Sequence, residues 1–249
     1  MADLSFDNFN VLCTKAEGRD KVARLFQYSA RALVGFVGMA APKAGTTLSK
    51  VETHARTAMV QLAGARRTHR WCKEFPVIQS IPKSLSIKDP IDRALDLMQK
   101  VSLATFMIID HIGHMKQWKI LSGGKRSGAG TIQLGLKFFC LSNFVGALVQ
   151  AKKFLMLNAS QEDKSKDKSK CLETAAKHLL LVLQTAHLSL MYQTHDALVG
   201  VAGIITSSMD VKAQWPAKPA AAPAKALPAA GAAAASGVTE GKEKAVKST

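Results

Sequence analysis

Apolar residues recur at three- and four-residue steps along much of the chain, which is the period of an amphipathic α-helix. The clearest case covers residues 19–37. Its apolar positions are Val22, Leu25, Phe26, Leu33 and Phe36, and its opposite stripe carries Asp20, Arg24, Gln27 and Arg31. This pattern predicts a helix that faces the core of a bundle or one that lies on or in a membrane. Residues 1–10 show no such pattern.

A second helix is predicted over residues 50–74. One third of its circumference is basic, with Arg56, Arg66, Arg67, Arg70 and Lys73. The apolar side is narrow and built from small residues, and Trp71 and Phe75 lie near one edge. The basic stripe fits a helix at a membrane interface as well as it fits a solvated charged face.

Four more helices are expected. Pro76 and Pro82 predict a break, after which Asp89 as N-cap and Pro90 in the first turn favour a helix over residues 90–118. A nearly all-apolar helix follows over 131–157, with Lys137 inside it. The last two helices cover 172–195 and 196–211.

Two segments have a composition that favours disorder. Residues 161–170 are hydrophilic, so a basic disordered link is expected at about 159–171. From Trp215 the chain is rich in Ala, Pro and Lys and has few bulky apolar residues. These features predict a helical domain over residues 1–211 and a disordered tail over 212–249.

Membrane-spanning segments are suggested towards the C-terminus. Eighteen residues between Lys177 and Asp196 contain no Asp, Glu, Lys or Arg, which is near the lower limit of about 17–25 for a spanning helix. Residues 197–209 are too few to span alone, but Gly200 and Gly203 would allow close helix contact. Hydropathy alone is therefore also compatible with a soluble helical protein.

The net charge is +16, from 34 Lys and Arg against 18 Asp and Glu. The excess is spread along the chain, and it would suit anionic lipid head groups or nucleic acid. The four cysteines lie far apart and form no CxxC pair, which argues against a zinc site or a disulfide framework.

Candidate chemistry is sparse. Asp110 and His114 are four residues apart and could share a helix face, beside His111, but no third histidine lies near them. GxSxG, HExxH, P-loop and Rossmann motifs are absent from the sequence. We therefore expect no enzyme, no metal and no cofactor.

The segment from Glu17 to Arg31 resembles the peroxin-11 family, whose members elongate peroxisomes before division. The family's opening motif GRDK is present as Gly18, Arg19, Asp20 and Lys21. Its RLxQY continuation is matched by Arg24-Leu25-Phe26-Gln27-Tyr28.

Three further regions are similar to this family. The first runs from Ala65 to Pro76 and looks like its amphipathic-helix segment, although Thr68-His69 and Trp71-Cys72 stand where the family has more aliphatic or aromatic residues. The second is Asp110-His111, followed by Trp118. The third is the stretch 195–208 with Trp215, so the resemblance covers roughly residues 5–215.

The resemblance implies an all-α, membrane-associated helical bundle with amphipathic helices and one or two short hydrophobic C-terminal membrane helices. It implies a peroxisomal or glycosomal membrane protein that remodels its membrane without covalent chemistry. Its expected partners are anionic lipids, further copies of the chain, and fission factors, namely a dynamin-related GTPase with its adaptor. Candidate lipid contacts are Arg24, Arg31, Arg66, Arg67, Arg70, Lys73, Trp71 and Phe75.

Two other functions stay open. Some relatives are thought to form solute pores, and Lys137 with the histidines could line such a path. A soluble basic protein that binds nucleic acid is the third possibility, but the Ala/Pro/Lys tail holds only a small share of the charge, so we expect no nucleic acid partner.

Overall fold

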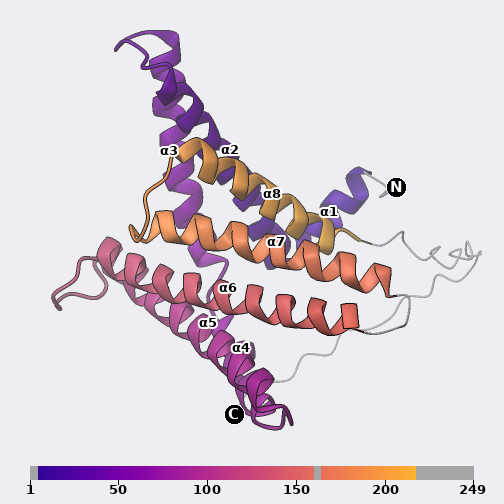
Figure 1. The fold of residues 1–249 in the computed structure, drawn as a ribbon. Helices are drawn as coiled ribbons and strands as arrows, with labels where there is room; N and C mark the ends of the chain where they lie inside the picture. Colours follow the sequence, from indigo (N-terminus) through magenta and orange to yellow (C-terminus); the bar gives the residue numbers. More distant parts are fainter. Residues whose placement is uncertain (1–4, 160–163, 217–249) are drawn as a thin grey trace, which may run out of the picture. The chain divides into compact units, whose positions relative to one another are not determined.

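The computed structural model describes residues 5–159 and 164–216, which form eight α-helices and no strand (Figure 1). The predicted all-α class is therefore confirmed. In chain order the helices are α1 (Phe6–Thr14), α2 (Ala16–Met39), α3 (Thr47–Thr68), α4 (Glu74–Leu85), α5 (Pro90–Gln117), α6 (Gly128–Ala159), α7 (Ser165–Leu188) and α8 (Asp196–Gln214).

Side-chain caps explain where three of these helices begin. Asp89 accepts a hydrogen bond from the backbone N–H of Asp92 at 2.8 Å, and Pro90 occupies the first turn of α5. Thr46 caps α3 and Ser5 caps α1 in the same way. The start that the sequence predicted for α5 is thus confirmed, with its cause.

The structure departs from the sequence-based boundaries in three places. Residues 6–14 form α1, although the sequence pattern of residues 1–10 did not predict a helix. The expected break at Pro76 and Pro82 is the short helix α4; Pro76 lies in its first turn, where a helix tolerates a missing N–H, and Pro82 lies inside it. Most of the expected disordered link belongs to α7, which begins at Ser165 with Asp167 in its first turn.

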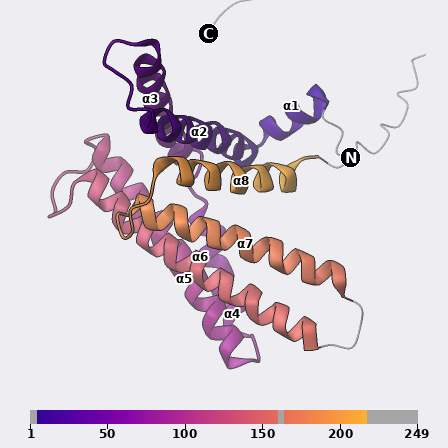
Figure 2. The same ribbon diagram turned by 45° about the horizontal axis from the view of Figure 1, so that its top comes forward.

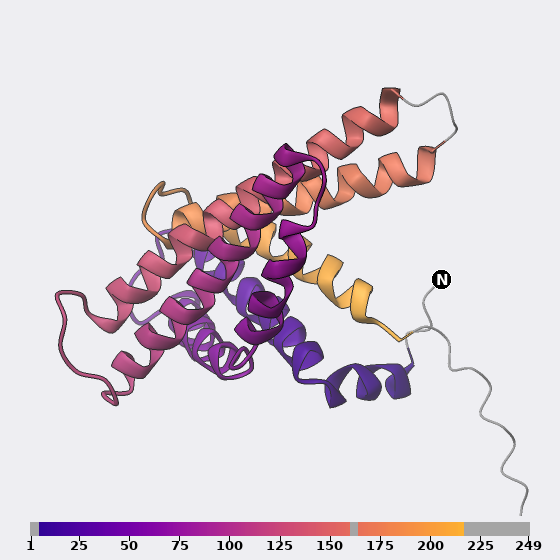
Figure 3. The ribbon, with the colours of Figure 1, turned by 90° about the horizontal axis from the view of Figure 1, so that it is seen from below.

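Neighbouring helices pack as successive hairpins on one side of the fold. Helix α5 packs on α6, α6 packs on α7, and α4 lies against α5 (Figure 3). Elsewhere α2 packs on α3, which follows it, and on α8, which lies far away in the sequence (Figure 2). Contacts between α7 and α8 join the two groups.

Small residues bring α2 and α8 close together. A Cβ added to Gly200 would lie 2.3 Å from the backbone nitrogen of Ala32, and one on Gly203 would lie 2.0 Å from the ring of Tyr28. Gly35 of α2 faces Ala197 of α8 just as closely. Close backbone approach through small residues is the usual way in which helices pack in membranes.

Parts of two sequence-based assignments lie outside the described residues. These are residues 160–163 of the expected link and residues 217–249 of the expected tail. Within the described chain, α8 continues to Gln214, so the helical region extends past the boundary expected at residue 211.

Candidate functional site

The polar stripe of α2 points into the protein, where Arg24 lies at the centre of a buried network. Its guanidinium donates to Asp210 of α8 at 2.9 Å, to Gln184 of α7 at 3.2 Å and to Thr206 of α8 at 3.0 Å. All four side chains are buried. Three helices are therefore held together through one charged side chain.

Asp210 is shared by three cations. Besides Arg24, it pairs with Lys21 of α2 at 3.3 Å and with Lys177 of α7. Burial alone would raise the pKa of this carboxyl, but the three cations outweigh burial and lower it. Asp210 is thus held in its charged form.

A second pair joins α2 to α3. Arg66 donates from Nε to Asp20 at 3.0 Å and from Nη1 to Gln27 at 2.6 Å. Burial lowers the pKa of Arg66 to about 10, against the opposing attraction of Asp20. For Asp20, burial would raise the pKa, but Arg66 leads the cations that lower it instead.

Two arginines of the basic stripe converge on one carboxylate of α5. The Nε of Arg67 lies 3.4 Å from Asp110, and Nη2 of Arg70 lies 3.0 Å from its other oxygen. The neighbouring His111 faces Glu74 at 3.6 Å. Asp110 therefore serves an ion-pair cluster, and the described residues contain no group of three His, Cys, Asp or Glu side chains that could hold a metal.

Arg31 takes part in a fourth polar cluster. It pairs with Asp196 at the start of α8, and His187 of α7 lies 3.3 Å from the same carboxylate oxygen. The Nδ1 of this histidine accepts a hydrogen bond from the backbone N–H of Thr194 at 3.1 Å. The cluster thus fixes the loop between α7 and α8 against α2.

These placements revise the expected lipid contacts. The arginines expected to face lipid from α2 and the basic stripe instead bond to side chains inside the protein: Arg24, Arg31, Arg66, Arg67 and Arg70. The reason is that an amphipathic helix has two faces, and in α2 and the end of α3 the polar faces pair with one another. Sequence periodicity gives the two faces but not which of them points inwards.

The remaining candidates lie nearer the surface. Trp71 and Phe75 are exposed, and Trp71 packs at 5.8 Å between ring centroids against Trp118. Lys73 is partly exposed and lies 3.9 Å from Glu17. Lipid contact by these three residues stays a prediction.

The GRDK motif has a structural explanation at each position. Gly18 lies so close to α1 that an added Cβ would approach the carbonyl oxygen of Leu12 at 1.9 Å. Arg19 donates to the carbonyl oxygens of Cys13 and Thr14 at the end of α1. Asp20 and Lys21 then supply the pairs to α3 and α8 described above.

Several helices expose apolar stripes, in addition to a buried apolar core that includes Val34, Val145 and Val199. Exposed apolar side chains occur at helical spacing on α2 (Phe26, Leu33, Phe36), α5 (Met98, Val101, Ile108), α6 (Leu141, Phe144, Leu148) and α8 (Leu198, Val201, Ile205). Large exposed apolar surfaces mark contact with a membrane or with another protein.

Helix α6 is the one described helix that is long and apolar enough to cross a membrane. It has 32 residues, and 44% of its most apolar stretch is buried inside the protein, whereas Leu141, Phe144 and Leu148 are exposed. The C-terminal helices α7 and α8, expected from the sequence as membrane helices, do not combine that length with that apolarity.

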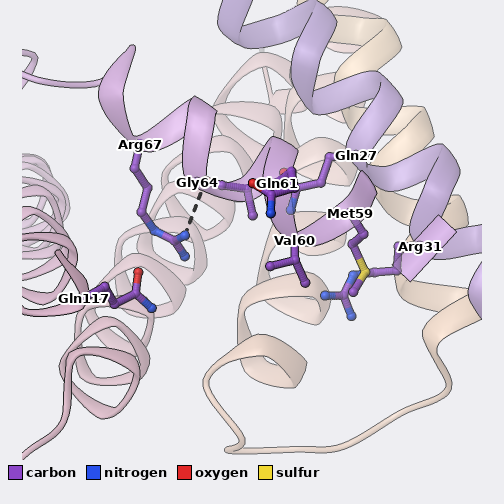
Figure 4. A pocket seen from close by; sticks show the side chains of 9 residues that line it. Gln27, Arg31, Met59, Val60, Gln61, Gly64, Arg67 and Gln117 are labelled. Carbon is purple, nitrogen blue, oxygen red and sulfur yellow. Dashed lines mark hydrogen bonds between the residues drawn. The ribbon is translucent and has the colours of Figure 1, made fainter. Parts of the chain in front are cut away.

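The protein contains a cavity of about 460 Å³. Its walls come from α2, α3, α5, α6 and α7, and its lining includes Arg24, Arg66, Arg67 and Arg70. A second hollow of about 570 Å³ adjoins it and shares Gln27, Arg31 and Arg67 with it (Figure 4).

The fold and its interior define an all-α protein that buries paired charges and exposes apolar helix faces. A profile of the family described as Peroxisomal biogenesis factor 11 (PEX11) matches residues 6–215, so the chain belongs to this family. It is a peroxisomal membrane protein involved in peroxisome proliferation. No curated protein and no solved structure matches it.

Proposed function

We propose that this protein remodels the peroxisomal membrane through the outward apolar faces of α2, α5, α6 and α8. The observation that supports this is the combination of buried ion pairs, such as Arg24–Asp210, with exposed helix stripes made of Phe, Leu, Ile and Val. Ionisable residues in membrane-embedded helices face the bundle interior and pair with one another. In this proposal α6 reaches deepest into the membrane, and the apolar faces of α2, α5 and α8 add contact area within one leaflet.

Insertion of several apolar faces into one leaflet expands that leaflet and favours curvature. The buried pairs keep the helices from separating, so the inserted volume acts as one rigid body. We further propose, from the family resemblance, that anionic lipids attract the basic chain, that copies of the chain associate, and that a dynamin-related GTPase and its adaptor are recruited.

The test uses the full chain reconstituted into liposomes, with tubulation scored by electron microscopy. Phe144→Ser with Leu148→Ser removes two exposed apolar groups from α6 and is expected to reduce tubulation while the thermal midpoint in detergent stays unchanged. Lys153→Ser, an exposed change on the same helix, is the matched control. Unchanged tubulation by the double variant would contradict the proposal.

The alternative functions receive less support. Lys137 lies on the exposed surface of α6, whereas His187, one of the histidines considered with it, is engaged with Asp196, so these two side chains have different surroundings. Conductance in planar bilayers without tubulation would favour the pore. Because five of the arginines pair with carboxylates of the protein instead of gathering on one exposed face, binding to nucleic acid is not favoured.

A further inference from the structure

The cavity of about 460 Å³ has two unlike walls. The side formed by α2 and the end of α3 carries Arg24, Arg66, Arg67 and Arg70. The side formed by α5, α6 and α7 carries apolar residues, among them Leu103, Met107, Ile132, Leu136 and Leu181. Its size falls within the range of about 300–1,000 Å³ for small-molecule pockets.

The basic wall holds more positive charge than its carboxylates balance. Seven Lys and Arg side chains line the cavity, against Glu17, Asp20 and Asp110. Asp196 and Asp210 pair with three of those cations, but Asp210 is also shared with Lys177, so counting these groups too leaves a surplus of three positive charges. Arg67 and Arg70 must share the single carboxylate of Asp110.

Hydrogen-bond donors are also left over at this wall. The Nε atoms of Arg31 and Arg70 are buried, and no hydrogen-bond partner for either is found among the described residues. Arg70 is held over the ring of Phe106, with 5.6 Å from its guanidinium carbon to the ring centroid. A buried donor without a partner costs free energy that an anionic ligand would recover.

We propose that this cavity binds one anionic amphiphile whose phosphate-monoester head meets the arginines and whose acyl chain follows the apolar wall. A phosphate monoester carries about −1.5 to −2 charges at pH 7, which would offset most of this positive surplus. A guanidinium group can bind two phosphate oxygens at once through two parallel N–H···O hydrogen bonds. The hollow beside Gln27, Arg31, Met59 and Gln117 gives the head a way in (Figure 4).

This site is distinct from the proposed lipid-facing surface, because it takes a single molecule into the interior. Its test therefore needs no bilayer, and membrane remodelling can fail while binding succeeds, or the reverse. The full chain is purified in a neutral detergent, and bound 1-oleoyl lysophosphatidic acid is counted and titrated by native mass spectrometry. We expect one molecule per chain and saturation.

Two probes separate the contributions of head and chain. Lysophosphatidylcholine with the same acyl chain has no net charge, and we expect it to bind at least about tenfold more weakly. Inorganic phosphate alone is expected to compete poorly. Equal binding of the choline lipid, or equal competition by phosphate, would overturn the assignment of an anionic amphiphile.

Variants locate the site. Arg67→Gln removes one cation from the wall and leaves Asp110 paired with Arg70, so it should weaken binding at least about tenfold. Leu136→Trp places a larger side chain in the apolar part of the cavity and should independently weaken binding of the lipid. Arg56→Gln lies on the exposed side of the same helix as Arg67 and is the matched control. Wild-type affinity in both folded variants would sink the proposal.

Discussion

Arg24 and Asp210 are 186 residues apart in the sequence, yet Nη1 of the arginine lies 2.9 Å from Oδ2 of the aspartate. Both side chains are buried, and Lys21 and Lys177 approach the same carboxylate. The pairing is unequal: Arg24 has other partners in Gln184 and Thr206, whereas Asp210 is the acceptor that three cations share. This inequality makes the two residues differ in importance for stability.

We predict that Asp210→Ala destabilises the protein more than Arg24→Met. Removing the aspartate leaves three cations without their common carboxylate, and loss of one partner of a buried pair costs about 3–5 kcal/mol. Removing the arginine leaves Asp210 paired with two lysines and costs about 1–3 kcal/mol. The free energy of unfolding in mild detergent, from denaturant titration followed by circular dichroism, measures both. The opposite order would show that Asp210 is not the shared acceptor.

The close contact between α2 and α8 gives a second prediction. Gly200→Ala should destabilise, because its Cβ would lie 2.3 Å from backbone nitrogen that cannot move aside. Gly38→Ala, in α2, meets nothing within 4 Å and should instead stabilise by about 0.5–1 kcal/mol, since alanine loses less chain entropy than glycine. Thermal midpoints of the two variants should therefore move in opposite directions.

Acid should weaken the packing of α2 against α3 and α8. The pKa values of Asp20 and Asp210 lie below the ordinary 3.8, mainly because cations oppose the effect of burial. A lowered carboxyl pKa adds stability above the unfolded value, and that stability is lost as pH falls through the folded value. These two carboxyls should not change the thermal midpoint from pH 7 to about 5 and should lower it below about pH 4. Burial lowers the pKa of His114 and of His178, so these histidines should already lower the midpoint somewhat as the pH falls below their ordinary 6.5.

The variant Asp20→Asn separates this carboxyl from the others. It should be less stable than the natural protein at pH 7, and the difference should shrink as the pH approaches 3. A difference that stays constant over that range would mean that Asp20 does not gain its charge-dependent stability from Arg66.

The positions of most helices could be predicted because they depend on local sequence. The cap at Asp89 and Pro90 and the period of residues 19–37 concern neighbours along the chain, and the structure has helices there. α4 could not be predicted in the same way, because proline rules favour a break and the packing of this helix on α5 opposes them.

The direction of each amphipathic face could not be read from the sequence. Gln27 and Phe26 are adjacent, and periodicity separates them onto two faces, but burial of Gln27 depends on Arg66, which is 39 residues away. In water the apolar face would turn inwards. A lipid environment removes that preference. Pairing of polar side chains between helices then determines which face of each helix points inwards. The cavity could not be predicted from the sequence either, because its walls come from five helices and depend on how these helices pack.

A double-mutant cycle on Asp20 and Arg66 tests the inward direction of the polar faces. If Arg66 pairs with Asp20 inside the protein, the effects of Asp20→Asn and Arg66→Gln on the free energy of unfolding should not add, and a coupling of about 1–3 kcal/mol is expected. The exposed pair of Glu52 and Arg56 on α3 supplies the control, with an expected coupling of about 0.3–0.5 kcal/mol. If Arg66 instead turned outwards to lipid head groups, its coupling to Asp20 would fall to the value of the control pair or below.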